Sequence, residues 1–284
     1  MFFTLKQPDS GGKLIRLSFA LIFLLVSIPH AQDFQGLSND TVQQRFAPPP
    51  GFTRVQVQKG SWADWLRHLP LLPPGSAVKD YRGRIRVKVD DSTLAAVTAI
   101  RISKRNLDQC MDILMRLRSI YLQQTGRQKV ISFPLPDGLL LSWQDWQSGQ
   151  RPVFKGLHFR LIQSAGIDSS AANFEHYLRT LFNYSGTQTF YHYYPKMDPS
   201  TLRIGDFIVK KGRKGHAVMI VDLAQNKAGQ RVALFGQGDT PACAFYILNY
   251  RKGQPWVPID FSKKVIPLPI KKKMSWDGLR RFGD

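Results

Sequence analysis

The chain has 284 residues, of which 43% are hydrophobic, and this composition excludes a protein that is disordered throughout. The length suits one large domain or two small ones. Forty Lys and Arg residues against 20 Asp and Glu residues give a formal net charge of +20, which favours an anionic partner. Because the sequence contains no basic motif with interleaved aromatic residues of the RNA-binding kind, we expect no nucleic acid among its partners.

The first 31 residues have the organisation of a cleaved signal peptide. Basic residues precede an uncharged run over residues 17–28, and Ala31 is suited to the position before the cleavage site. The run of 12 residues is shorter than a membrane span requires, and an uncleaved anchor is the alternative. We therefore expect an exported protein of the periplasm or cell envelope, with no stable membrane span after signal cleavage.

After a polar lead-in over residues 32–50, the pattern predicts one α+β domain over residues 51–284. Alternating residues predict a short strand within 52–58, and Ser61 with Asp64 predicts a capped helix that follows. Further strands are expected over 84–89 and 96–102.

The strongest helical signal covers residues 106–126. Asn106 is a suitable N-cap, and Gly126 is a natural stop. The helix has one apolar face at helical spacing, formed by Cys110, Ile113, Leu114, Leu117 and Tyr121.

The second half of the chain predicts one hairpin, one helix and a series of strands. Residues 129–146 are typical of strand, turn and strand, and residues 169–186 of a helix capped near Ser169 or Ser170. The aromatic segment 190–195 is expected to form a packed surface loop, or alternatively to line a groove. Strands are then expected at 207–211, 216–223, 231–237 and 244–250, followed by a proline-rich, basic C-terminal tail.

The two cysteines, Cys110 and Cys243, allow two interpretations. In an oxidising compartment they form one disulfide, or else one is a reactive thiol and the other is buried. Cys110 falls in the first turn of the predicted helix, where the helix dipole lowers the pKa of a thiol. The alternative for Cys110 is a buried side chain that only fills space.

His216 begins a predicted strand that ends in Asp222. Six residues of strand span roughly 20 Å, so Asp222 is too distant to orient the histidine. A hairpin centred on residues 226 and 227 places Gln237 opposite His216, and Asp222 opposite Arg231. A turn shifted by one residue places Asp239 opposite His216 instead. In either register a polar side chain faces the imidazole.

Two resemblances rest on these motifs. The stretches LDQCMDILMRLRSIYL and GDFIVKKGRKGHAVMIVD resemble an uncharacterised bacterial family, a domain of unknown function, with likeness from Arg45 to Trp256. The Gly-Asp and Gly-His pairs of residues 205–216 resemble those of papain-like cell-wall peptidases of the NlpC type. That likeness implies a papain-like arrangement, in which a nucleophile-bearing helix packs on a mainly antiparallel sheet, with Cys110, His216 and Gln237 as the catalytic residues.

The chain departs from the NlpC pattern in two respects. Cys110 follows Gln109, where those peptidases have an Asp-Cys-Ser sequence or a close variant. Cys110 and His216 are also 106 residues apart, which implies an insert near residues 128–200 that forms a substrate groove or a cover.

Together these features predict an exported cysteine hydrolase that cleaves amide bonds, as in cell-wall peptide or a peptidoglycan-like substrate. Expected substrate-binding residues are Gln109, Asp206, Trp143 and Tyr193, and Gln109 or Asn106 is a second candidate donor to the oxyanion. No histidine has metal-ligand spacing, so we expect neither a metal nor another cofactor. The alternative is a non-catalytic envelope-binding protein that uses its basic surface on anionic polymers.

Overall fold

The structure is a computed structural model that describes residues 33–35, 40–156 and 158–283. The predicted signal peptide therefore lies outside the described residues. Within these ranges, no helix has the length and apolar character that a membrane crossing requires.

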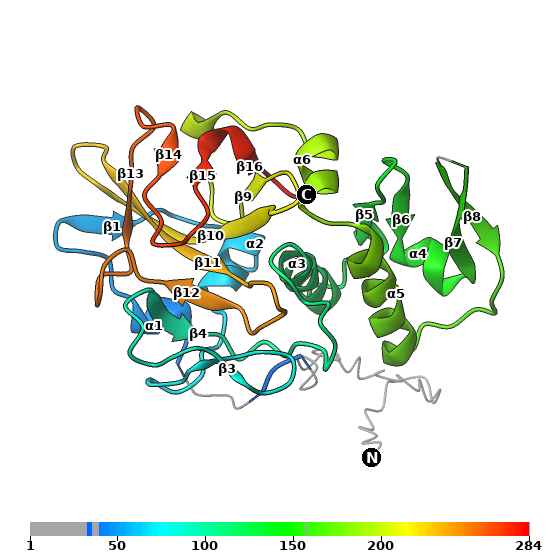
Figure 1. Cartoon of the computed structure of the whole chain (residues 1–284). Coiled ribbons are helices and arrows are strands. Elements are labelled where there is room, and N and C mark those ends of the chain that lie inside the picture. Colours follow the sequence, from blue (N-terminus) through cyan, green and yellow to red (C-terminus); the bar gives the residue numbers. More distant parts are fainter. Residues whose placement is uncertain (1–32, 36–39, 157, 284) are drawn as a thin grey trace, which may run out of the picture.

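An eight-stranded antiparallel sheet forms the centre of the fold (Figure 1). Its main strand order is β16-β9-β10-β11-β12-β4, while β1 pairs with β10 and β13 pairs with β11. The strands are β1 (Phe52–Arg54), β4 (Leu94–Val97), β9 (Phe207–Lys210), β10 (His216–Asn226), β11 (Arg231–Gln237), β12 (Tyr246–Leu248), β13 (Val257–Ile259) and β16 (Leu279–Arg280).

Strand β10 is the longest of the sheet, and its residues from His216 to Ala224 are all buried. A strand covered on both faces needs apolar residues at successive positions rather than alternating ones. The unbroken apolar run after His216 meets this requirement. The start of β10 is therefore a buried position, where a polar side chain needs partners inside the protein.

Helix α3 (Asp112–Gln124) lies between the sheet and a lateral lobe formed by residues 128–184 (Figure 1). The lobe contains α4 (Trp143–Gln147), α5 (Ala171–Tyr184), β5 (Ser132–Pro134), β6 (Leu140–Ser142), β7 (Gln150–Lys155), β8 (His158–Gln163) and η1 (Gln128–Val130). Every residue of α3 from Asp112 to Leu122 is buried, because the helix has neighbours on opposite sides. The lobe falls within the stretch that the sequence predicts as an insert.

The remaining short elements complete the chain. They are α1 (Val42–Arg45), α2 (Trp62–Arg67), α6 (Thr187–Tyr193), β2 (Val78–Lys79), β3 (Ile85–Val87), β14 (Val265–Ile266), β15 (Met274–Ser275), η2 (Pro199–Thr201) and η3 (Trp276–Gly278). Because α1 lies inside the expected lead-in and its Val42 is fully buried, the packed part of the chain begins before Gly51.

Local capping signals placed two helices correctly. The Ser61 hydroxyl accepts a hydrogen bond from the Asp64 backbone at the start of α2, and Ser170 does the same for Asn173 at the start of α5. The aromatic segment 190–195 was expected to be a loop. Most of it instead belongs to helix α6, which begins at Thr187.

The predicted start of the central helix at Asn106 is wrong. The Asn106 side-chain oxygen accepts a hydrogen bond from the Ala242 backbone, at 2.7 Å, and caps no helix. Regular helix begins at Asp112, and a hydrogen bond from the Ile113 N–H to the Gln109 carbonyl carries the helical pattern back to Gln109. Cys110 therefore lies in the turn that leads into the helix, two residues before Asp112.

The β10–β11 hairpin has the shifted one of the two predicted registers at the His216 end, and neither of them near the turn. Met219 pairs with Gly236, and Asp222 pairs with Leu234, with an irregularity between Ile220 and Asp222. The turn contains three residues between Asn226 and Gln230 rather than a two-residue centre, and Gly229 adopts a φ of +81° there. Asp222 therefore does not face Arg231.

Candidate active site

A buried hydrogen bond joins the first residue of β10 to the last residue of β11. His216 Nε2 and Gln237 Oε1 are 2.6 Å apart, and both residues are only 3% exposed. The Gln237 amide nitrogen in turn donates to the Tyr246 hydroxyl on β12. With the amide oxygen acting as the acceptor, His216 Nε2 carries the proton and Nδ1 carries the lone pair. The site thus presents a neutral imidazole with a defined tautomer.

The observed register explains how Gln237 reaches the histidine. Since Met219 pairs with Gly236, Gln237 comes beside Val218, which shares a strand face with His216. The contact is a diagonal one between neighbouring strands. The other candidate, Asp239, forms an ion pair with Arg86 at 3.0 Å, so the hydrogen-bonding partner of His216 is Gln237.

The second ring nitrogen of His216 is unsatisfied. Nδ1 is buried and has no hydrogen-bond partner among the described residues. Burial lowers the pKa of His216, an effect that the Gln237 hydrogen bond partly offsets and that the positive charge of Lys272 reinforces. The imidazole is therefore neutral near pH 7, with a free lone pair on Nδ1.

Cys110 lies beside the start of β10. The backbone of Ala217, which follows His216, is close enough to act on the Cys110 sulfur as a hydrogen-bond donor. A Cβ atom built on Gly238, the residue after Gln237, would lie 2.9 Å from Ile113 Cγ2. The first turn of α3 thus packs directly against the strand ends that carry His216 and Gln237.

The Cys110 thiol is not acidified as the sequence suggested. Burial raises its pKa to about 11, and the charge of Asp112 adds to this rise. The Ala217 backbone and the charge of Lys272 lower the pKa, but by less than burial and Asp112 raise it. Desolvation outweighs the favourable helix terminus, so the resting thiol is protonated at neutral pH.

Cys243 does not form a disulfide with Cys110. Both cysteines are free and buried. Burial raises the pKa of the Cys243 thiol to about 12, with a further contribution from Asp239. The structure therefore shows two buried thiols in place of the disulfide, and the pKa of each is raised.

Two segments distant in sequence hold the loop before His216. A Cβ atom on Gly215 would lie 2.1 Å from the Thr187 hydroxyl and 2.8 Å from the Lys210 carbonyl, so only glycine fits against α6. On the C-terminal segment, the Lys272 ammonium donates to the Gly215 carbonyl at 2.9 Å. These contacts fix the backbone immediately ahead of the histidine.

Among the predicted substrate-binding residues, Gln109 adjoins the cysteine. Its amide nitrogen donates to the Asn106 carbonyl, and its amide oxygen accepts from the Thr240 hydroxyl. Tyr193 on α6 is half exposed and lines a pocket of about 360 Å³ with Thr187 and Gln188. Gln188 accepts a hydrogen bond from the loop that precedes His216, so this pocket borders the Cys–His region.

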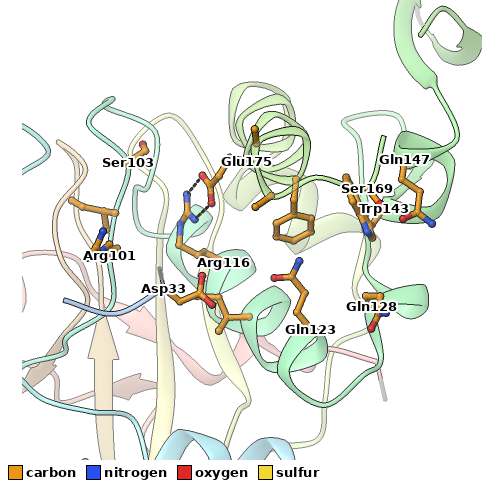
Figure 2. Close-up of a pocket in the computed structure, with 15 residues that line it drawn as sticks. Asp33, Arg101, Ser103, Arg116, Gln123, Gln128, Trp143, Gln147, Ser169 and Glu175 are labelled. Atoms are coloured by element: carbon orange, nitrogen blue, oxygen red, sulfur yellow. Dashed lines mark hydrogen bonds and ion pairs between the residues drawn. The ribbon is translucent and has the colours of Figure 1, made fainter. Parts of the chain in front are cut away.

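The structure does not bring Asp206 and Trp143 to the cysteine. Asp206 is buried in an ion pair with Arg281, with contacts of 2.6 and 2.8 Å, and precedes β9, whose far end pairs with His216. Trp143 lines a separate pocket of about 720 Å³ between α3 and α5, beside the ion pair of Arg116 with Glu175 (Figure 2).

Sequence reasoning missed Tyr246 and Lys272. Tyr246 lies on a strand that was predicted, but only the pairing of β11 with β12 reveals that its hydroxyl meets Gln237. Lys272 belongs to a run of three lysines with no local signal of a role. Within the described ranges, no group of three or more His, Cys, Asp or Glu side chains is arranged to hold a metal ion.

Comparison with known proteins gives one match. No curated protein and no solved structure matches the chain. A family model covers residues 42–276, which include Cys110, His216, Gln237 and the whole lateral lobe. The chain therefore belongs to the family described as Domain of unknown function (4846).

Proposed function

We propose that this protein is a papain-like cysteine hydrolase that cleaves amide bonds, with Cys110 as the nucleophile, His216 as the base and Gln237 as the residue that orients the base. The observation that carries the proposal is the 2.6 Å hydrogen bond between His216 Nε2 and Gln237 Oε1. It leaves Nδ1 as a buried base without a partner, close to the turn that bears a thiol. Nucleophile, base and orienting amide are the three parts that such chemistry requires.

The first half-reaction forms a thioester. The Cys110 sulfur attacks the amide carbonyl carbon while the thiol proton passes to His216 Nδ1. The resulting imidazolium keeps its Nε2–H on the Gln237 oxygen, which stabilises the positive charge. His216 then transfers the proton to the amide nitrogen as the C–N bond breaks, and the amine leaves.

The second half-reaction restores the enzyme. His216 Nδ1 accepts a proton from water as the water oxygen attacks the thioester carbonyl. The C–S bond breaks, the carboxylic acid leaves, and the proton returns to the sulfur. Water supplies the proton that the departing amine took, and Cys110 and His216 are the protein groups that exchange protons in this cycle.

The start of α3 supplies the electrostatic part of the mechanism. Backbone N–H groups in the first turn of a helix have no acceptor within the helix and point toward its N-terminal end. The Cys110 N–H lies in the turn that leads into this end of the helix, and we assign it to the developing oxyanion. Gln109 would have to release the Asn106 carbonyl, now 3.2 Å from its amide nitrogen, to become a second donor.

The electrostatics of the pair imply a resting enzyme without an ion pair. The pKa of Cys110 is raised and that of His216 is lowered, both chiefly by burial, so proton transfer from sulfur to nitrogen is unfavourable in the free protein. We infer that transfer occurs only when a bound carbonyl accepts the sulfur. The thiol is thereby protected from adventitious oxidation and alkylation.

The predicted signal peptide and the basic composition support a place for this activity in the periplasm or cell envelope, on peptide amides such as those of the cell wall.

The test is hydrolysis of cell-wall peptide fragments, followed by mass spectrometry of the products. Cys110→Ala and His216→Ala should each reduce turnover by about 1,000-fold or more, as loss of a nucleophile or base does. Cys243→Ala is the matched control and should retain activity. Full turnover by Cys110→Ala would refute the proposal.

A second candidate function is non-catalytic binding of an anionic envelope polymer. The β7–β8 hairpin favours it, because Arg151, Lys155 and Arg160 lie on that hairpin and no acidic residue occurs between Asp145 and Asp168. Calorimetric titration with linear polyphosphate tests this role. Lys155→Gln with Arg160→Gln should weaken binding and reduce its salt dependence, whereas Lys104→Gln with Arg105→Gln should not. Equal effects of both pairs would show that net charge alone governs binding.

A further inference from the structure

A second site candidate lies farther along α3, where Arg118 follows Cys110 by eight residues. It is a pocket of about 540 Å³ between α2, α3, the segment before β9 and the C-terminal segment. We call it the arginine pocket, and its polar lining includes Trp62, Arg118, Arg203, Asp206, Arg231 and Arg281. The Cys–His mechanism uses none of these residues.

The charges of the arginine pocket are unbalanced. Its four arginines face one carboxylate, that of Asp206. Asp206 is held by Arg281 through two contacts, and Arg118 donates to the Gly283 carbonyl. Arg203 and Arg231 form no salt bridge with any described residue. The pocket therefore has an excess of positive charge. Positive charge concentrated in a concave site favours an anionic ligand.

Two buried donors of the pocket also lack acceptors. Arg231 Nε and Trp62 Nε1 are both buried, and neither has a hydrogen-bond partner among the described residues. Buried polar groups are nearly always hydrogen-bonded, so each exception requires an explanation. A bound anion would bring an acceptor to this part of the protein, which the described residues do not supply.

The indole position depends on the adjacent backbone. A Cβ atom on Gly205, which has a φ of +90°, would lie 2.3 Å from Trp62 Nε1. Glycine thus allows the donor edge of the indole to lie directly over the chain just before Asp206. Ile204 and Phe282 add apolar surface to the lining, so the pocket combines oxyanion donors with apolar walls.

We propose that the arginine pocket binds a small organic anion through a carboxylate or phosphate group, held by Arg203, Arg231 and Trp62 Nε1. Guanidinium groups pair with both kinds of group, often through two hydrogen bonds at once. The apolar walls accommodate the body of the ligand. This site does not depend on the proposed hydrolase activity.

Calorimetric titration at low ionic strength tests the site with two probes, N-acetylalanine as a carboxylate on an apolar body and inorganic phosphate. We expect one-to-one binding of at least one probe. Arg203→Gln should weaken it by about tenfold or more, the usual effect of losing a charged hydrogen-bond donor. Trp62→Phe, which keeps an aromatic ring but removes the N–H, should also weaken binding. Arg105→Gln, which removes the same charge outside the pocket, is the matched control.

The outcomes separate the possibilities. Tighter binding of N-acetylalanine identifies a carboxylate ligand, and tighter binding of phosphate identifies a phosphorylated one. Absence of one-to-one binding for both probes overturns the proposal, as does equal weakening by Arg203→Gln and Arg105→Gln. Binding that survives Arg203→Gln unchanged also overturns it. Cys110→Ala should bind as the wild type does, so a failed hydrolase test leaves this result intact.

Discussion

The pH dependence of Cys110 alkylation follows directly from the burial of the thiol. With a pKa of about 11, the thiolate fraction is about 10⁻⁴ at pH 7 and about 10⁻² at pH 9. An unperturbed cysteine, with a pKa near 8.5, is about 3% thiolate at pH 7. Since only the thiolate reacts, Cys110 should be alkylated about 300-fold more slowly than a free cysteine at pH 7. Its rate should then increase about tenfold for each pH unit up to pH 9.

The assay is iodoacetamide labelling followed by intact mass spectrometry, on a Cys243→Ala background in which Cys110 is the single thiol. The unfolded protein provides the free-cysteine reference. Because His216 is neutral and forms no ion pair with the resting thiol, His216→Ala should leave the pH profile almost unchanged. A rate that is level between pH 6 and pH 8 in the wild type, and falls in His216→Ala, would refute this reasoning. It would show that a thiolate–imidazolium pair overcomes the desolvation.

Three further predictions concern the framework of the site. Asp222→Asn removes the fully buried partner of two arginines and should lower the free energy of unfolding by about 3–5 kcal/mol in urea titrations, whereas a loss below about 1 kcal/mol would contradict a structural role. Gly215→Ala places a methyl group against the Thr187 hydroxyl and should lower the free energy of unfolding by about 1–3 kcal/mol in the same titration. Unchanged stability would show that α6 shifts to accommodate the methyl group. Tyr246→Phe leaves the Gln237 amide without its acceptor and should reduce kcat more than it alters KM, and an unchanged kcat would show that Gln237 needs no support.

Features encoded by neighbouring residues could be predicted from the sequence. Ser61 and the pair Ser169 and Ser170 were identified as cap candidates, and Ser61 and Ser170 bind backbone groups three residues away. The strand after His216 was identified from its continuous apolar run. The start of α3 was missed because the Asn106 side chain binds Ala242, which is 136 residues away, and no local pattern reports that contact.

The candidate site was predicted in the same uneven way. Gln237 was the first candidate for the partner of His216, but the structure has the shifted register at this end, in which Asp239 was expected to face the imidazole. The three-residue turn and the irregularity in β10 shift the pairing, and the long Gln237 side chain restores the contact diagonally. Lys272 could not have been predicted, since only tertiary packing brings the C-terminal segment to Gly215. The raised pKa of Cys110 likewise depends on burial by distant segments.

The position of the final strand determines when the site can form during synthesis. Strand β16 pairs with β9, Arg281 holds Asp206, and Lys272 binds the backbone beside His216. Strand β16, Arg281 and Lys272 are all synthesised after Cys110 and His216. Because a chain folds progressively as it is synthesised, a nascent polypeptide contains the nucleophile and base long before it contains the segments that frame them. The emerging chain thus lacks an assembled site until residues 272–281 are present.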